Sequence, residues 1–261
     1  MTEQKQAETQ SAKPFLAQYD ETMIARRIAE QQLPLAVFWD MDGTLIDSEP
    51  YWHDGEIEIA HANGGEWDEA LGWQCTGTSV PNVARKMIEH GTKLSVQEIH
   101  DQLISYVARR EQERMPWIPG AREALELVAQ AGIPSVLVTS SPRHVARGLV
   151  RQAPTGAFGG YVCGDDVRAN KPDPDPYRQA ARVLGIDPDD AHLMARCVAF
   201  EDSGVGLQSA TAAGTTVLAL TGYIRTADGQ PAGPFFDSIA TYDELSIDTL
   251  RNMVSRRLQS L

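Results

Sequence analysis

Apolar residues along this chain gather in short, continuous runs separated by stretches with helical spacing. Runs without polar alternation are typical of parallel strands that are buried on both faces. Between them, apolar residues recur three or four positions apart, and several of these stretches end in a glycine. The alternation predicts a doubly wound, Rossmann-like α/β core built on a parallel sheet. The predicted strands are 35–39, 133–139, 161–163, 197–200 and 216–220.

A long segment after the first predicted strand has a different pattern. Residues 51–117 lack strand-like runs and are mainly helical in their spacing. Ser95 and Glu98 fit a capping box, and the residues that follow keep one face apolar. We therefore expect an α-helical cap inserted into the α/β core.

The pattern divides the chain into an extension, a core and a cap. The N-terminal extension spans 1–32; its first part is polar and expected to be disordered, and its second part has helical spacing. The core comprises 33–50 and 118–261, and the cap comprises 51–117. The Gly- and Pro-rich stretch 222–234 predicts a loop after the last strand.

Composition narrows the classes of partner. The chain has 261 residues, 42% of them hydrophobic, which is enough for a substantial core. A formal net charge of −13 would repel nucleic acid and anionic membranes, but it does not oppose a small phosphorylated metabolite held by local positive groups. Three widely spaced cysteines, a polar N-terminus and the lack of a membrane-length apolar run favour a cytoplasmic protein. The sequence leaves the oligomeric state open.

Two acids directly follow the first predicted strand. Asp40 and Asp42 flank Met41, and Gly43 comes next. This edge of an open α/β sheet is where ligands bind. Paired carboxylates are costly there unless a cation or a proton transfer uses them. A turn at Asp42-Gly43 would explain the second acid but not Asp40.

Further polar groups follow later strands and precede predicted helices. Thr139-Ser140-Ser141 could bind an anion at a helix start, with Ser141 as the N-cap. Lys171 precedes a proline-rich segment and could neutralise phosphate charge. Glu201 and Asp202 would repel each other without a cation, and Mg²⁺ prefers carboxylate ligands. We therefore expect a Mg²⁺ site formed by Asp40 and Asp202, with Glu201 bound directly or through water.

The order of these motifs, from about residue 35 to about residue 220, resembles that of the haloacid dehalogenase-like hydrolase superfamily. The resemblance implies that Asp40 is a nucleophile that becomes an aspartyl-phosphate, and that Asp42 is the general acid and base. It also implies that the backbone carbonyl of Asp42 faces the metal. The implied phosphate-binding residues are Thr139, Ser140, Lys171 and Gly43.

A few positions distinguish the branches of this superfamily. Asp42 argues against the dehalogenases and the phosphonate-cleaving enzymes, and Met41 argues against the ion pumps, which carry a lysine there. The sugar-phosphate mutases have a hinge histidine where this chain has Trp52, although His53 is adjacent. We therefore predict a phosphatase acting on a sugar or polyol phosphate. A beta-phosphoglucomutase-like mutase and a non-catalytic phosphate-binding protein remain alternatives.

Overall fold

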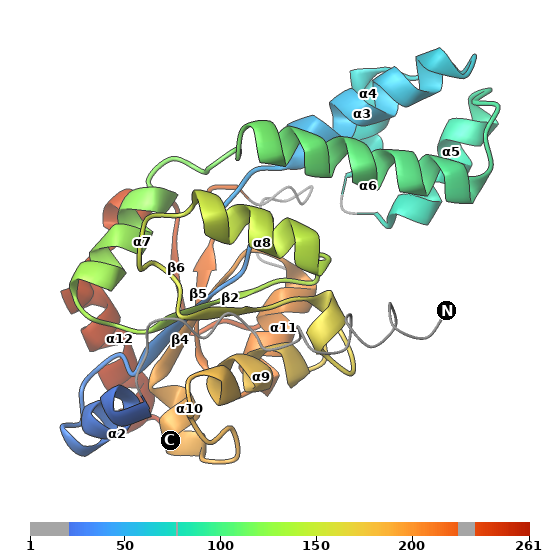
Figure 1. Cartoon of the computed structure of the whole chain (residues 1–261). Coiled ribbons are helices and arrows are strands. Elements are labelled where there is room, and N and C mark those ends of the chain that lie inside the picture. The colour runs from blue at the N-terminus through green and yellow to red at the C-terminus, as the bar shows by residue number, and fades with distance from the viewer. Residues whose placement is uncertain (1–20, 77, 224–232) are drawn as a thin grey trace, which may run out of the picture.

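The computed structural model describes residues 21–76, 78–223 and 233–261, and within these residues six parallel strands form one sheet (Figure 1). The sheet order is β3-β2-β1-β4-β5-β6. The strands are β1 (Ala36–Trp39), β2 (Ser135–Val138), β3 (Gly160–Val162), β4 (Cys197–Glu201), β5 (Thr216–Leu220) and β6 (Asp237–Ile239). The prediction of a doubly wound α/β core is confirmed.

Helices account for most of the remaining described residues. In chain order they are α2 (Glu21–Ala29), α3 (Glu49–Ala62), α4 (Glu69–Cys75), α5 (Val80–Glu89), α6 (Val96–Glu113), α7 (Ala121–Gln130), α8 (Arg143–Gln152), α9 (Asp175–Val183), α10 (Ala191–Ala195), α11 (Gly204–Ala212) and α12 (Ile247–Gln259). Short 3₁₀ turns lie at Gly164–Asp166 and Tyr242–Glu244.

The sheet separates two apolar layers. Residues of α7, α8 and α12 pack on one face, where the Trp39 and Phe200 rings of neighbouring strands stack at 4.1 Å between centroids. Residues of α2, α9, α10 and α11 pack on the other face, around Phe38 and Tyr177. Because β1 and β4 are buried on both faces, β1 and residues 197–200 of β4 are continuous apolar runs, as the pattern predicts.

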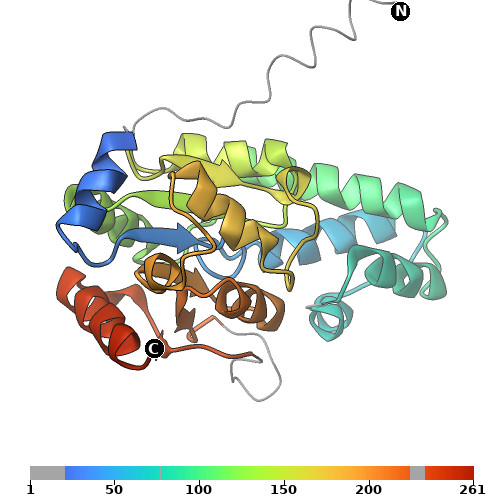
Figure 2. The ribbon, with the colours of Figure 1, turned by 90° about the horizontal axis from the view of Figure 1, so that it is seen from below.

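Helices α3–α6 form a separate group beyond the core (Figures 1 and 2). They have their own apolar centre, in which Met87, Ile99 and Leu103 are fully buried. Burying each such side chain contributes about 1.5–3 kcal/mol before entropy is counted. The expected capping box is present: the Glu98 amide donates to Ser95 Oγ at 3.2 Å, and the Ser95 amide donates to the Glu98 carboxylate at 2.8 Å.

The structure differs from the sequence prediction at several elements. Strand β6 and helices α10 and α12 were not predicted; β6 has three half-buried or exposed residues and no apolar run. The N-cap of α8 is Pro142, so the expectation of Ser141 as N-cap was wrong. The disorder expected at the start of the N-terminal extension lies outside the described residues, as does the part of its helical stretch that precedes residue 21. Positions 224–232 of the predicted loop also lie outside them.

Candidate active site

The predicted acids meet where the sheet order reverses. From β1 the chain continues to β2 and β3 on one side, and then returns to β4 on the other side of β1. Crevices at such reversals are the usual ligand sites of open α/β sheets. Asp40 follows β1 and donates its amide proton to the Phe200 carbonyl of β4 at 3.1 Å. Glu201 is the last residue of β4, so Asp40 and the Glu201-Asp202 pair come together at the carboxyl edge.

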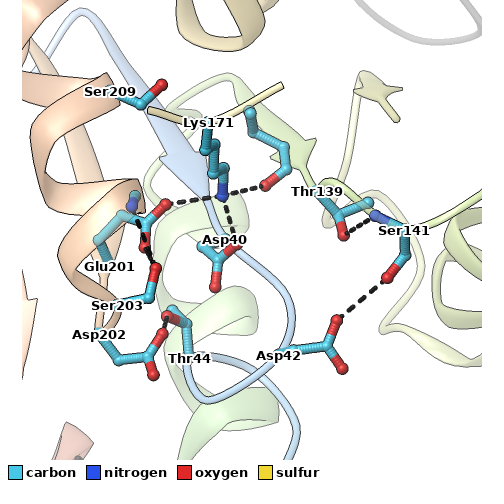
Figure 3. Close-up of polar contacts among 12 residues, drawn as sticks. Asp40, Asp42, Thr44, Thr139, Ser141, Lys171, Glu201, Asp202, Ser203 and Ser209 are labelled. Carbon is cyan, nitrogen blue, oxygen red and sulfur yellow. Dashed lines mark hydrogen bonds and ion pairs between the residues drawn. The ribbon is translucent and has the colours of Figure 1, made fainter. Parts of the chain in front are cut away.

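Three carboxylates form one cluster there. Among the described residues, oxygen atoms of Asp40, Glu201 and Asp202 lie within 4.8 Å of one another (Figure 3). Thr44 Oγ1 donates to Asp202 Oδ1 at 3.1 Å. Burial, followed by the charges of Asp40 and Glu201, raises the pKa of Asp202 well above its ordinary value. Such crowded carboxylates fit a divalent metal ion, which would relieve this repulsion.

Lys171 supplies a positive charge beside this cluster. Its side chain is 4% exposed and its Nζ donates to Asp40 Oδ1, to Glu201 Oε1 at 2.6 Å and to the Val138 carbonyl at 3.0 Å (Figure 3). Burial lowers the pKa of Lys171, but the charges of Asp40 and Glu201 outweigh it and raise the pKa above its ordinary value. The ammonium group therefore stays charged and offsets one of the three carboxylates.

The loop after β1 approaches the cluster closely. Gly43 has a φ of +81°, and a Cβ at this position would lie 2.1 Å from Asp202 Oδ2. Only glycine combines that backbone conformation with so little space. Gly43 therefore lies at the edge of the site, and its predicted contact with phosphate stays a prediction.

Asp42 points away from the three-carboxylate cluster (Figure 3). Its carboxylate accepts from Ser48 Oγ at 2.7 Å and from Ser141 Oγ at 3.2 Å. Burial and the charge of Asp40 raise the pKa of Asp42, while the bond from Ser48 opposes this rise. A raised pKa favours the protonated form, as a general acid requires. The side chain lies outside the three-carboxylate cluster, so its metal contact through the backbone carbonyl stays a prediction.

The predicted hydroxyl residues separate into three positions. Thr139 is buried, and its Oγ1 accepts from the Ser141 amide at 3.0 Å. Ser140 is exposed on the connecting loop. Ser141 Oγ donates to Asp42 (Figure 3), so this hydroxyl is engaged with the loop after β1 and not with the start of α8. Thr139 and Ser140 adjoin the site, and their phosphate contacts stay predictions.

The sequence analysis did not identify two residues that position the Glu201 carboxylate, Tyr177 and Gly206. The Tyr177 hydroxyl donates to Glu201 Oε1 at 2.5 Å. A Cβ at position 206 would lie 1.9 Å from Glu201 Oε2, so Gly206 leaves the room that this carboxylate occupies. Tyr177 resembles any core aromatic in the sequence, whereas a glycine near the start of α11 was a signal that could have been used.

The two residues at and beside the position of the mutase histidine, Trp52 and His53, lie in α3. His53 is buried between α3 and α4, with its Nε2 3.1 Å from Thr76 Oγ1 and 3.5 Å from Glu49 Oε2. Its ring meets Trp73 edge-on at 4.5 Å between centroids. Trp52, at the position of the mutase histidine, packs against the apolar centre of α3–α6.

Comparison with known proteins places this geometry in a family. Residues 34–214 match the haloacid dehalogenase-like hydrolase family. The chain belongs to this family. Among its curated relatives, hexitol phosphatase B of Escherichia coli is 30% identical over 69% of this chain and 80% of its own. A phosphorylated carbohydrates phosphatase of Thermotoga maritima is 32% identical over 69% of this chain and 81% of its own.

Solved structures support the same fold. CbbY from Rhodobacter sphaeroides in complex with phosphate is 25% identical, with a TM-score of 0.64 over 82% of this haloacid dehalogenase-like chain and 96% of its own. A beta-phosphoglucomutase of Clostridium difficile is 17% identical, with a TM-score of 0.64. The match covers 86% of this chain and 98% of the mutase, and it shows the fold alone. The resemblance inferred from the motifs is confirmed, and the names of the curated relatives agree with the expected phosphatase.

No described helix is long and apolar enough to cross a bilayer.

Proposed function

We propose that this protein is a Mg²⁺-dependent phosphatase that hydrolyses a small sugar or polyol phosphate through an aspartyl-phosphate. The observation that carries the proposal is Asp40, whose carboxylate lies at the strand-order reversal between a buried lysine and two further acids. The substrate class is supported by the names of two curated relatives, a hexitol phosphatase and a phosphorylated carbohydrates phosphatase.

Asp40 is the proposed nucleophile. Lys171 engages Oδ1 of this carboxylate, which leaves Oδ2 to attack phosphorus. The P–O bond to the alcohol breaks as the bond to Oδ2 forms, so one difficult displacement is divided into two steps. The ammonium group of Lys171 lies where it can also offset the negative charge of an arriving phosphate.

Asp42 is the proposed acid and base. Its raised pKa favours a proton that it can give to the departing alcohol oxygen. The resulting carboxylate then takes a proton from the water that attacks the aspartyl-phosphate. Ser48 and Ser141 hold both oxygens of Asp42, and so fix its direction between these steps.

Asp40 and Asp202 are the proposed metal ligands, with Glu201 bound directly or through water. A bound Mg²⁺ would neutralise phosphate oxygens and this acidic cluster. Lys171 and Tyr177 hold Glu201 from the protein side, and Thr44 orients Asp202. Thr139, Ser140 and the amide of Gly43 are the proposed phosphate-binding groups.

Helices α3–α6 are proposed to act as a cap that covers the core during turnover. Near the proposed boundaries at 51 and 117, two connecting segments run side by side: the Asp47 amide donates to the Pro116 carbonyl at 2.9 Å, and Ile46 pairs with Trp117. A hinge of two adjacent segments can bend while both units keep their cores. Closure would exclude water and position the leaving group.

A mutase is a weaker candidate than a phosphatase. In the mutase reading, His53 would serve the hinge histidine's role. The structure places its Nε2 beside Thr76 and Glu49 within the cap, where it is already engaged. A non-catalytic phosphate-binding protein would not need a carboxyl such as Asp42, which Ser48 and Ser141 hold in place.

Hydrolysis of an aryl phosphate tests the proposed function. We expect phosphate release with Mg²⁺, its loss in excess chelator and its recovery when Mg²⁺ is restored. Ca²⁺ should not replace Mg²⁺, because its larger and looser coordination misplaces the nucleophile and the phosphate. Undiminished turnover in chelator would contradict the metal proposal, and no turnover under any of these conditions would contradict the phosphatase.

A further inference from the structure

The start of α8 is capped by a residue from another loop. The Arg143 amide, the first of the helix, donates to the Asp165 carboxylate at 2.9 Å, across 22 positions of sequence. The Arg143 guanidinium also donates to Asp166 Oδ1 at 2.6 Å. The free amides of a first helical turn need acceptors and favour negative charge. Asp165 therefore fills the role that the sequence analysis expected of Ser141.

Further contacts fix the main chain of the loop between β2 and α8. Gly164, in the 3₁₀ turn that follows β3, donates its amide proton to the Ser141 carbonyl at 3.0 Å. A Cβ at position 164 would lie 2.5 Å from the Ser140 carbonyl oxygen, so a glycine is needed for this close approach. The turn at 164–166 thus holds both the first residue of α8 and the residue that carries the Ser141 hydroxyl.

The Ser141 hydroxyl is consequently directed at the acid–base carboxyl. A serine before a helix usually turns its oxygen towards the free amides of the first turn. Here the first amide already has Asp165 as its acceptor, and Ser141 Oγ donates to Asp42 Oδ2 at 3.2 Å (Figure 3). The two bonds therefore depend on each other: one carboxylate caps the helix, and the hydroxyl is left for Asp42.

We propose that Asp165 is a positioning residue for Asp42. By capping α8 in place of Ser141, it keeps the Ser141 hydroxyl on the carboxyl that protonates the departing alcohol. The inference rests on the proposed function, which gives Asp42 that step. Without the Asp165 carboxylate, the Arg143 amide loses its acceptor and the Ser141 hydroxyl can turn back to the helix.

Substitutions at Asp165 test this role without disturbing the core, because the residue is exposed. Asp165→Ala removes the acceptor, whereas Asp165→Asn keeps a carbonyl oxygen that can cap the helix. Asp190→Ala is the matched control: the Asp190 carboxylate accepts from the His192 amide at 2.9 Å and caps α10. Because α10 leads into the amino end of β4, this control removes a helix cap at the edge of the sheet opposite the site.

Two substrates separate proton transfer from phosphate binding. The alcohol of glucitol 6-phosphate needs a proton to depart, whereas the leaving group of 4-nitrophenyl phosphate needs little help. Single-turnover rates with enzyme in excess measure the first half-reaction. We expect Asp165→Ala to lower the saturating rate for glucitol 6-phosphate about three- to tenfold, the loss that one hydrogen bond represents, and to leave 4-nitrophenyl phosphate unchanged. Asp165→Asn and Asp190→Ala should keep wild-type rates on both.

A double-mutant cycle shows whether Asp165 acts through Ser141. In Ser141→Ala protein the hydroxyl is absent, so the further change Asp165→Ala should add no selective loss on glucitol 6-phosphate. The same selective loss in both backgrounds would contradict the inference. Equal losses on both substrates, a loss confined to the substrate concentration for half-saturation, or no loss in Asp165→Ala would contradict it as well.

Further variants keep the outcome decisive. Should Asp165→Ala fail to fold, Asp165→Glu replaces it, since the longer side chain displaces the acceptor: a selective loss on glucitol 6-phosphate supports the inference, and any other result overturns it. Asp42→Asn, measured on the same two substrates, identifies failure of the proposed function itself. If Asp42→Asn shows no selective loss on glucitol 6-phosphate, or the wild type hydrolyses neither ester, the acid step is wrong; a selective loss in Asp42→Asn without one in Asp165→Ala overturns only the positioning role.

Discussion

At the scale of single residues, neighbours decide what each carboxyl can do. Asp40 and Asp42 are two positions apart, yet Asp40 is held by Lys171 and Asp42 by two hydroxyl groups. Burial raises the pKa of Asp42, which favours a proton on this carboxyl. An acid paired with an ammonium group suits a nucleophile, and an acid that favours its proton suits a proton donor.

Asp42→Asn should slow turnover of an alkyl phosphate by roughly 10²–10⁴-fold, because acid–base help is lost in both half-reactions. An aryl leaving group needs little protonation, so the first half-reaction should survive better with an aryl phosphate. Rapid-quench kinetics should then show a burst of the phenol followed by slow phosphate release. Equal losses on alkyl and aryl substrates, without a burst, would argue against the acid role.

The sequence predicted which residues come together at the sheet edge better than it predicted their contacts. Asp40, Lys171, Glu201 and Asp202 were identified because each follows a strand or precedes a helix, and the sheet edge brings such positions together. The bond from Ser141 to Asp42 spans 99 positions and has no local signature. Contacts of this kind depend on packing, and one sequence does not reveal them.

At the scale of elements, α11 can pack beside Glu201 because position 206 has no side chain. Gly206 lies against Glu201 Oε2. Gly206→Ala should displace either Glu201 or α11, and we expect a large loss of turnover. Gly148→Ala, in α8, is the matched control: a Cβ there meets nothing within 4 Å. This control should gain about 0.5–1 kcal/mol, the usual helix preference for alanine. Equal activity of the two variants in a phosphate-release assay would refute the packing argument.

Helices α3–α6 contain a buried acid, Glu56, whose protonation should affect stability. Burial raises the pKa of Glu56 to about 7 from its ordinary 4.5, although its bond from Trp67 Nε1 lowers it. The unfolded chain loses this proton first as pH rises, so the free energy of unfolding should fall between about 4.5 and 7. Glu56→Gln keeps the acceptor for Trp67 and removes this dependence.

Thermal unfolding of the wild type and Glu56→Gln at the two ends of this range tests the sign. The variant should match the wild type near pH 4.5 and melt higher above pH 7. Glu58→Gln, exposed on the same helix, is the control and should show no such divergence. A melting difference that is the same at both ends of the range would contradict the assigned pKa shift.

At the scale of the whole molecule, the α/β core was predictable and the placement of the helical unit was not. Continuous apolar runs specify buried parallel strands, whatever the loops do. The position of α3–α6 depends on a short pairing between residues 45–47 and 116–118, where the Ile118 amide donates to the Leu45 carbonyl at 2.9 Å. These few bonds involve ordinary hinge residues, so no sequence pattern marks them.

The most direct test of the account is detection of phosphate on Asp40. Asp42→Asn protein mixed with an aryl phosphate and Mg²⁺ should accumulate the covalent intermediate, because its hydrolysis is slowed more than its formation. After acid quenching, mass spectrometry should find one phosphoryl group on the peptide that contains Asp40, and Asp40→Asn protein should carry none and release no phosphate. Wild-type turnover by Asp40→Asn, or a phosphoryl group on another residue, would contradict the proposed mechanism.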